Sequence, residues 1–126
     1  MPSQMIIKCE SITLEASLED TPTALAIADA LPLTGFANRW GDEIYFTVPV
    51  DLPLEPGSRE LLELGELGYW PTGNAFCLFF GPTPLSQGNE IRAASAVNVF
   101  GKIQGDPEPL KTVQTGAIIQ LSLKTS

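Results

Sequence analysis

The stretch Val99-Phe100-Gly101-Lys102-Ile103 decides the fold of this chain. It ends an apolar, β-branched run over 96–103, which predicts a strand. A short helix is predicted over 107–113, and the alternating residues 117–123 predict a last strand. The chain therefore closes with a strand, a short helix and a strand.

The N-terminal part of the chain predicts two paired strands followed by a helix. Apolar and polar residues alternate over 5–16, with a turn near Glu10-Ser11. Asp20 or Thr21 can cap a helix that has Pro22 in its first turn and runs to about Leu31, where Pro32 stops it. The broad apolar face of this helix suits one end of a barrel.

The central part predicts two strand pairs separated by long loops. Strands over 36–40 and 43–48 are joined at Gly41-Asp42, with Ile44, Phe46 and Val48 toward the core. A second hairpin joins 67–70 to 75–80. The segments 49–66 and 81–95 are predicted to be loops, with at most a short turn of helix at 59–62.

These elements indicate a mainly β protein with about eight strands and two short helices. We expect a closed antiparallel β-barrel capped by the helices, because closure removes exposed strand edges. A chain of 126 residues is the usual size of one domain, so we expect a single domain over residues 1–126.

The composition excludes several classes of function. A formal charge of −8, with scattered cations, disfavours binding to nucleic acid or to an anionic membrane surface. Neither a membrane-spanning run nor a signal peptide is recognisable, and Cys9 and Cys77 fit buried thiols of a cytoplasmic protein. The absence of histidine excludes a Ser-His-Asp triad and most zinc sites, so we expect neither cofactor nor metal.

Several stretches resemble the cyclophilins. Val99–Ile103, followed by Asp106 and Leu110-Lys111, is similar to the cyclophilin strand that leads into the second helix, and Asp20–Ala24 resembles the entry to the first helix. The chain is still more similar to small prokaryotic cyclophilin-like proteins of unassigned function. The stretches that carry this resemblance are Trp40–Phe46, Gly68–Pro71, Cys77–Pro84 and Ser95–Ile103.

The resemblance implies the barrel more strongly than an activity. Cyclophilins are peptidyl-prolyl isomerases that bind an extended peptide on the outer face of the barrel and use an arginine to stabilise the twisted amide. Arg39 is the residue here that can stand near that arginine. The family's glutamine-glycine-glycine-aspartate stretch is replaced by 42–47, and its alanine-asparagine motif and pocket histidine are missing.

The residues themselves suggest a binding patch on the outer face. With Ile44 inside, Glu43 and Tyr45 point outward, and we expect them beside Arg39 and Trp70. A surface pairing of Arg39 with Asp42 or Glu43 is the alternative for the arginine.

Two further candidates have structural alternatives. Trp40 completes the candidate ligand-binding set, although either tryptophan can instead fill the core or a barrel end. Asn98 lies in an apolar run, where it can orient a ligand or tie down a loop.

Three functions remain open from the sequence. The first is a binding module that holds a peptide or small molecule in the outer groove. The second is a divergent isomerase that relies on Arg39. The third is an accessory subunit of an amidohydrolase-type complex, as the resemblance to barrels in allophanate hydrolase and 5-oxoprolinase implies. The sequence does not determine the oligomeric state.

Overall fold

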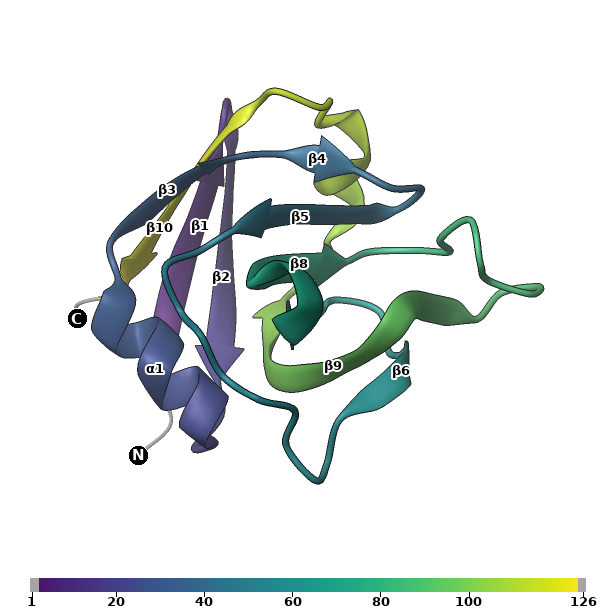
Figure 1. Cartoon of the computed structure of the whole chain (residues 1–126). Coiled ribbons are helices and arrows are strands. Elements are labelled where there is room, and N and C mark those ends of the chain that lie inside the picture. Colours follow the sequence, from purple (N-terminus) through teal and green to yellow (C-terminus); the bar gives the residue numbers. More distant parts are fainter. Residues whose placement is uncertain (1–2, 125–126) are drawn as a thin grey trace.

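The computed structural model describes residues 3–124 and consists mainly of strands (Figure 1). The strands of its first half are β1 (Gln4–Cys9), β2 (Ile12–Leu18), β3 (Leu33–Phe36), β4 (Asn38–Arg39), β5 (Glu43–Thr47) and β6 (Arg59–Leu62). Those of its second half are β7 (Glu66–Trp70), β8 (Ala75–Phe79), β9 (Ile91–Gln104) and β10 (Ile118–Leu123). The helices are α1 (Pro22–Ala30) and two 3₁₀ turns, η1 (Pro71–Gly73) and η2 (Glu108–Thr112).

The N-terminal hairpin and helix form as the sequence predicts. β1 and β2 pair antiparallel on either side of a turn in which Glu10 has a φ of 57°. The hydroxyl of Thr21 accepts a hydrogen bond from the amide of Ala24 at 3.1 Å and so caps α1, with Pro22 as its first residue. The predicted second helix is only the five-residue η2.

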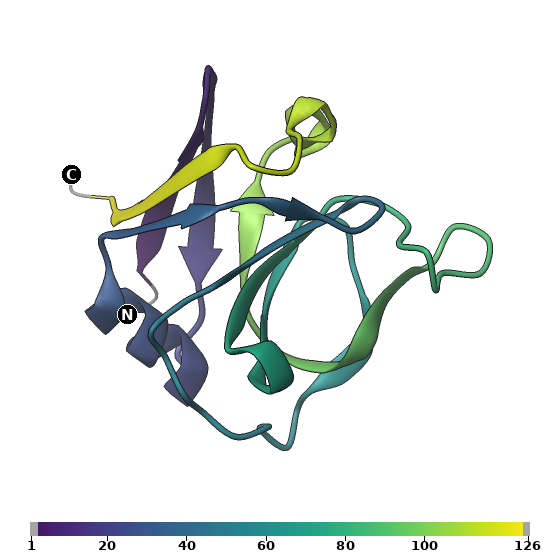
Figure 2. The same ribbon diagram turned by 45° about the horizontal axis from the view of Figure 1, so that its top comes forward.

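The prediction of a closed barrel of about eight strands is wrong in its detail. The ten-stranded sheet has the order β3-β10-β1-β2-β9-β7-β8-β5-β4, with β6 paired to β9, and hydrogen bonds do not close it. β3 and β4 stand at the two ends of this order, yet they are joined in the chain through Ala37. This segment pairs first with β10 and then with β5, so the sheet curls round while its ends meet only through the chain (Figure 2).

β9 (Ile91–Gln104) is much longer than the strand predicted over 96–103. Its second half pairs with β7 and β2, whereas its first half pairs with β6 and bends out of the main sheet (Figure 1). The predictions of a loop over 81–95 and of a helical turn at 59–62 are therefore wrong in part, because 91–95 and 59–62 are strands. β6 and the first half of β9, residues 91–97, pair outside the main sheet and form a small second layer.

The interior contains two apolar clusters, one on each side of β8. The larger cluster lies between the curled sheet and α1 and includes Phe46, Phe76 and Phe100. The smaller one lies on the opposite side of β8, where Cys77 and Phe79 pack with Val97 of β9. β8 is consequently buried on both faces, which explains why its sequence is a continuous apolar run.

The long segment between β5 and β6 is held in place by buried polar contacts. Asn98 is 1% exposed, and its side chain accepts from the amide of Glu55 at 2.8 Å and donates to the carbonyl of Pro53 at 3.0 Å. The carboxylate of Glu55 in turn accepts from the amide of Thr23 at 2.9 Å. Asn98 therefore ties this segment to α1 and β9.

Candidate functional site

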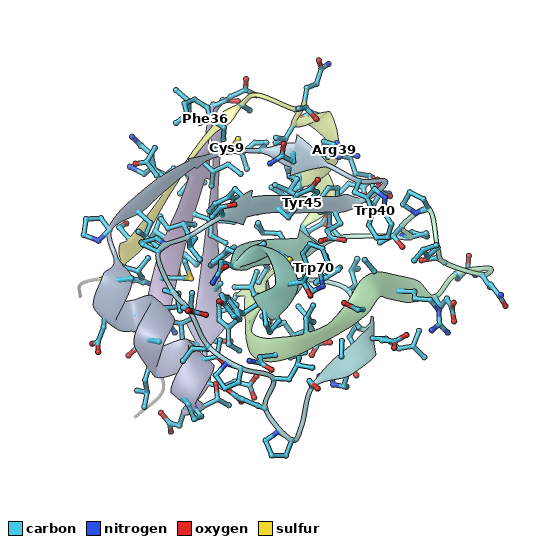
Figure 3. All side chains as sticks on the ribbon, in the orientation of Figure 1. Cys9, Phe36, Arg39, Trp40, Tyr45 and Trp70 are labelled. Carbon is cyan, nitrogen blue, oxygen red and sulfur yellow. The ribbon has the colours of Figure 1, made fainter. Side chains whose placement is uncertain are left out.

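An open pocket of about 230 Å³ lies between the outer face of β5 and β8 and the first half of β9. Figure 3 shows three of its aromatic residues: Tyr45 on β5, Trp40 beside the β4–β5 turn, and Trp70 at the end of β7. The pocket is lined by Trp40, Glu43, Tyr45, Trp70, Cys77, Ala93, Ala94 and Val97. Because the second layer forms one wall, the pocket exists only where β9 leaves the main sheet.

A two-residue turn places Trp40 and Glu43 side by side. The amide of Trp40 donates to the carbonyl of Glu43 at 2.9 Å, and the amide of Glu43 donates back at 3.2 Å. Gly41 begins the turn with a φ of 61°, the conformation that a type II′ hairpin requires of its first central residue. A Cβ at Gly41 would lie 2.8 Å from the ring of Pro84, so the close packing of the turn also requires glycine.

The remaining polar lining groups come from the neighbouring strands. Tyr45 lies opposite Cys77 in the β5–β8 pair, and this pairing directs both side chains to the same face. The indole nitrogen of Trp70 donates to the hydroxyl of Ser95 at 2.6 Å. That bond links the Trp70 ring to β9.

Glu43 is the unusual ionisable group of the site. Its residue is 6% exposed, and this burial raises the pKa of its carboxyl to about 7, although a hydrogen bond with the Cys77 thiol acts in the opposite direction. Burial, together with the neighbouring Glu43, also raises the pKa of Cys77 well above its ordinary value. At neutral pH the site therefore holds an un-ionised thiol beside a carboxyl that is poised between its two protonation states.

Arg39 does not join this site. On β4 it pairs with Ile44, so its side chain lies on the face of the core rather than on the face of Glu43. Its guanidinium bonds to Asp42 at 3.1 Å and to the carbonyl of Val113 at 2.6 Å, and it lies 5.1 Å from the ring centre of Phe80. The expected patch of Arg39 with Glu43 and Tyr45 is therefore not formed, and the arginine pairs with Asp42 instead.

The structure separates the other candidates as well. Trp40, Glu43, Tyr45 and Trp70 come together in the pocket, whereas Asn98 lies with the 50–58 segment outside the lining. No residue of 49–66 lines the pocket, so this long segment does not cover it.

Sequence reasoning missed the wall contributed by Cys77 and by Ala93, Ala94 and Val97 of β9. The signal for Cys77 was its alternation with Phe76 and Leu78, which places it on the outer face of its strand. Ala93 and Ala94 were missed because 91–95 is predicted to be part of a loop, and Val97 was missed because the predicted strand over 96–103 gives no sign that its start bends over β8.

Comparison with known proteins assigns the chain to a family. A family model described as Cyclophilin-like matches residues 3–122. The chain belongs to the cyclophilin-like family. Within residues 3–124, no helix has the length and apolar character needed to cross a membrane.

Two solved structures are similar to this cyclophilin-like chain. The solution structure of the hypothetical protein AF2241 from Archaeoglobus fulgidus is 47% identical, with a TM-score of 0.83, and the match covers 98% of this chain and 95% of that one. The structure of McbB in complex with tryptophan is 13% identical, with a TM-score of 0.70; the match covers 97% of this chain and 45% of that chain, and it shows the fold alone. No curated protein matches the chain.

The stretches that carry the resemblance to small cyclophilin-like proteins meet at the pocket. Trp40–Phe46 supplies Trp40, Glu43 and Tyr45; Gly68–Pro71 supplies Trp70; Cys77–Pro84 supplies Cys77; and Ser95–Ile103 supplies Val97. Segments far apart in the sequence thus build one cavity on the outer face of this cyclophilin-like sheet.

Proposed function

We propose that the protein is a binding module that holds a small molecule in the pocket between β5, β8 and β9. The observation that carries this proposal is a buried carboxyl, Glu43, that faces an open pocket walled by Trp40, Tyr45 and Trp70. Concave sites with apolar and aromatic walls and few convergent polar groups are typical of ligand pockets. A perturbed carboxyl inside such a pocket is a common mark of a functional site.

The shape of the site favours a small molecule over an extended peptide. The pocket volume of about 230 Å³ lies below the range of roughly 300–1,000 Å³ that is usual for drug-sized ligands. The Trp70–Ser95 hydrogen bond and the packed β4–β5 turn hold the walls in place before a ligand enters. A preformed site loses less conformational entropy when it binds.

The proposal is tested by titrating ¹⁵N-labelled protein with a library of small fragments. We expect ligands to shift the indole N–H signals of Trp40 and Trp70 and the amides of the first half of β9. Ala94→Leu would fill the rim of the pocket at an exposed position and should weaken these ligands. Ala96→Leu, on the same strand but outside the lining, is the matched control. A library without a single pocket ligand would contradict the proposal.

The other functions lack a comparable feature in the site. An isomerase that relies on Arg39 would need a guanidinium free to meet a peptide, but this group already bonds to Asp42 and to the carbonyls of Gly41, Lys111 and Val113. Among the residues that line the pocket, nothing favours the accessory-subunit hypothesis. Both hypotheses stay predictions.

A further inference from the structure

We infer that the ligand of this pocket is a small organic cation, a primary ammonium on a short apolar chain, whose charge is neutralised by Glu43. This inference rests on the proposed function, because it specifies the ligand of the same pocket. In the expected complex the ammonium N–H groups donate to the Glu43 carboxylate while the apolar chain lies against the aromatic walls.

The first argument is that the protein supplies no countercharge to Glu43. Within residues 3–124, none of the ion pairs of Arg39, Arg59, Arg92, Lys102, Lys111 and Lys124 involves Glu43. Lys8 is exposed on β1 and does not line the pocket. A carboxylate buried without a countercharge is costly, and a cationic ligand would remove that cost.

The second argument is the aromatic wall. Trp40, Tyr45 and Trp70 line the same pocket as the carboxyl. The face of an aromatic ring carries partial negative charge and attracts cations, with tryptophan the strongest. An anionic ligand would be repelled both by the faces of these rings and by the Glu43 carboxylate. The formal charge of −8 on the chain also disfavours an anion and favours a cation.

The third argument is that binding of an ammonium should be coupled to the release of one proton, from Glu43. The titratable groups that line the pocket beside Glu43 are the Tyr45 phenol on β5 and the Cys77 thiol on β8. Trp70 of β7 and the alanines and Val97 of β9 do not titrate. Because burial raises the pKa of Glu43 to about 7, the carboxyl must lose its proton to pair with an ammonium, which stays protonated up to about pH 10.

The test compares 3-methylbutylammonium with 3-methyl-1-butanol, its neutral analogue of nearly the same shape. Binding is measured by titration calorimetry and by the indole N–H shifts of Trp40 and Trp70. We expect the ammonium to bind at least about tenfold more tightly than the alcohol at pH 8, as charge-assisted hydrogen bonds imply. Its affinity should rise about tenfold between pH 6 and pH 8, because the ionised fraction of a group with a pKa of about 7 rises by that factor.

Glu43→Gln keeps the shape of the side chain and removes the charge. It should abolish both the preference for the ammonium and the pH dependence, whereas Glu10→Gln, in the exposed β1–β2 turn, should change neither. Equal affinities of both probes in wild-type protein, or a preference that survives Glu43→Gln, would overturn the inference and leave the pocket a binding site. Failure of both probes, while other fragments bind, would overturn it too. A pocket that binds no fragment at all would instead refute the proposed function.

Discussion

Glu43→Gln should remove most of the pH dependence of stability near neutrality. In the folded protein the pKa of this carboxyl is raised to about 7, so between pH 4.5 and 7 the folded state keeps a proton that the unfolded chain has released. Raising the pH across this window therefore favours unfolding. The stability that the protonated carboxyl retains at low pH is lost as the pH rises, and the loss is complete above the folded pKa.

The size of the effect follows from the two pKa values. For a shift from 4.5 to about 7, linkage gives a loss of about 2 kcal/mol between pH 5.5 and pH 8, as an upper estimate. No histidine is present to titrate in the same range, which makes the Glu43 contribution unusually easy to isolate. The glutamine variant should also be more stable than wild type at pH 8, because it buries no charge.

The assay is urea unfolding at several pH values from 5.5 to 8, for wild type, Glu43→Gln and the exposed control Glu10→Gln. The wild-type curve minus the Glu43→Gln curve cancels the α-amino group and every other common titration. A difference that stays flat over this range, with both proteins folded, would refute the assignment of a buried, unpaired carboxyl to Glu43. A similar change in Glu10→Gln would show that the loss of net charge alone is responsible.

Three further predictions concern packing and loop anchoring. Gly68→Ala would place a Cβ 2.7 Å from Val97 Cγ2 and should cost about 1–3 kcal/mol in urea unfolding, whereas Gly57→Ala, with open space around it, should change stability little. Asn98→Ala removes the hydrogen bonds to Glu55 and Pro53 and should lower the free energy of unfolding by about 2–3 kcal/mol. Hydrogen exchange at the Glu55 amide should become faster, and unchanged exchange would contradict the anchoring role. Arg39→Ala should destabilise by a similar amount and leave the indole N–H signals of the pocket unshifted; preserved stability would mean that its contacts with Asp42 and Val113 contribute little.

Local sequence signals predict β1, β2 and α1 accurately, whereas the predicted strand over 36–40 is in fact β3 (Leu33–Phe36) followed by the short β4 (Asn38–Arg39). Alternation over 5–16 gives β1 and β2, and the Thr21-Pro22 start with Pro32 beyond the end gives α1. The resemblance to the cyclophilin-like proteins predicts the overall arrangement of the strands and helices, which the local signals do not. That the sheet curls without closing could not be predicted, because it depends on β3 pairing with β10 just before β4 pairs with β5, a long-range choice that alternation does not encode.

Alternation predicts two residues of the candidate site, and the register of the β4–β5 pair predicts a third. Glu43 and Tyr45 were predicted to face outward because Ile44 and Phe46 face the core, and they line the pocket. The two-residue Gly41-Asp42 turn already places Trp40 opposite Glu43, and therefore Arg39 opposite Ile44. Because Ile44 faces the core, this register predicts that Arg39 lies on the opposite face of the sheet from Glu43 and Tyr45.

The bend in β9 explains both the missed wall and the chemistry of the pocket. A strand pair such as β5–β8 with one face on the core would normally expose its other face, and a glutamate there would be solvated. Here the first half of β9 covers that face with Ala93 and Val97, and Gly68 permits the close approach because it has no side chain to meet Val97. Glu43 is thereby moved from a solvent-facing position into an apolar pocket, which raises its pKa. The same covering layer thus creates the cavity and the buried, unpaired carboxyl that would bind the cation.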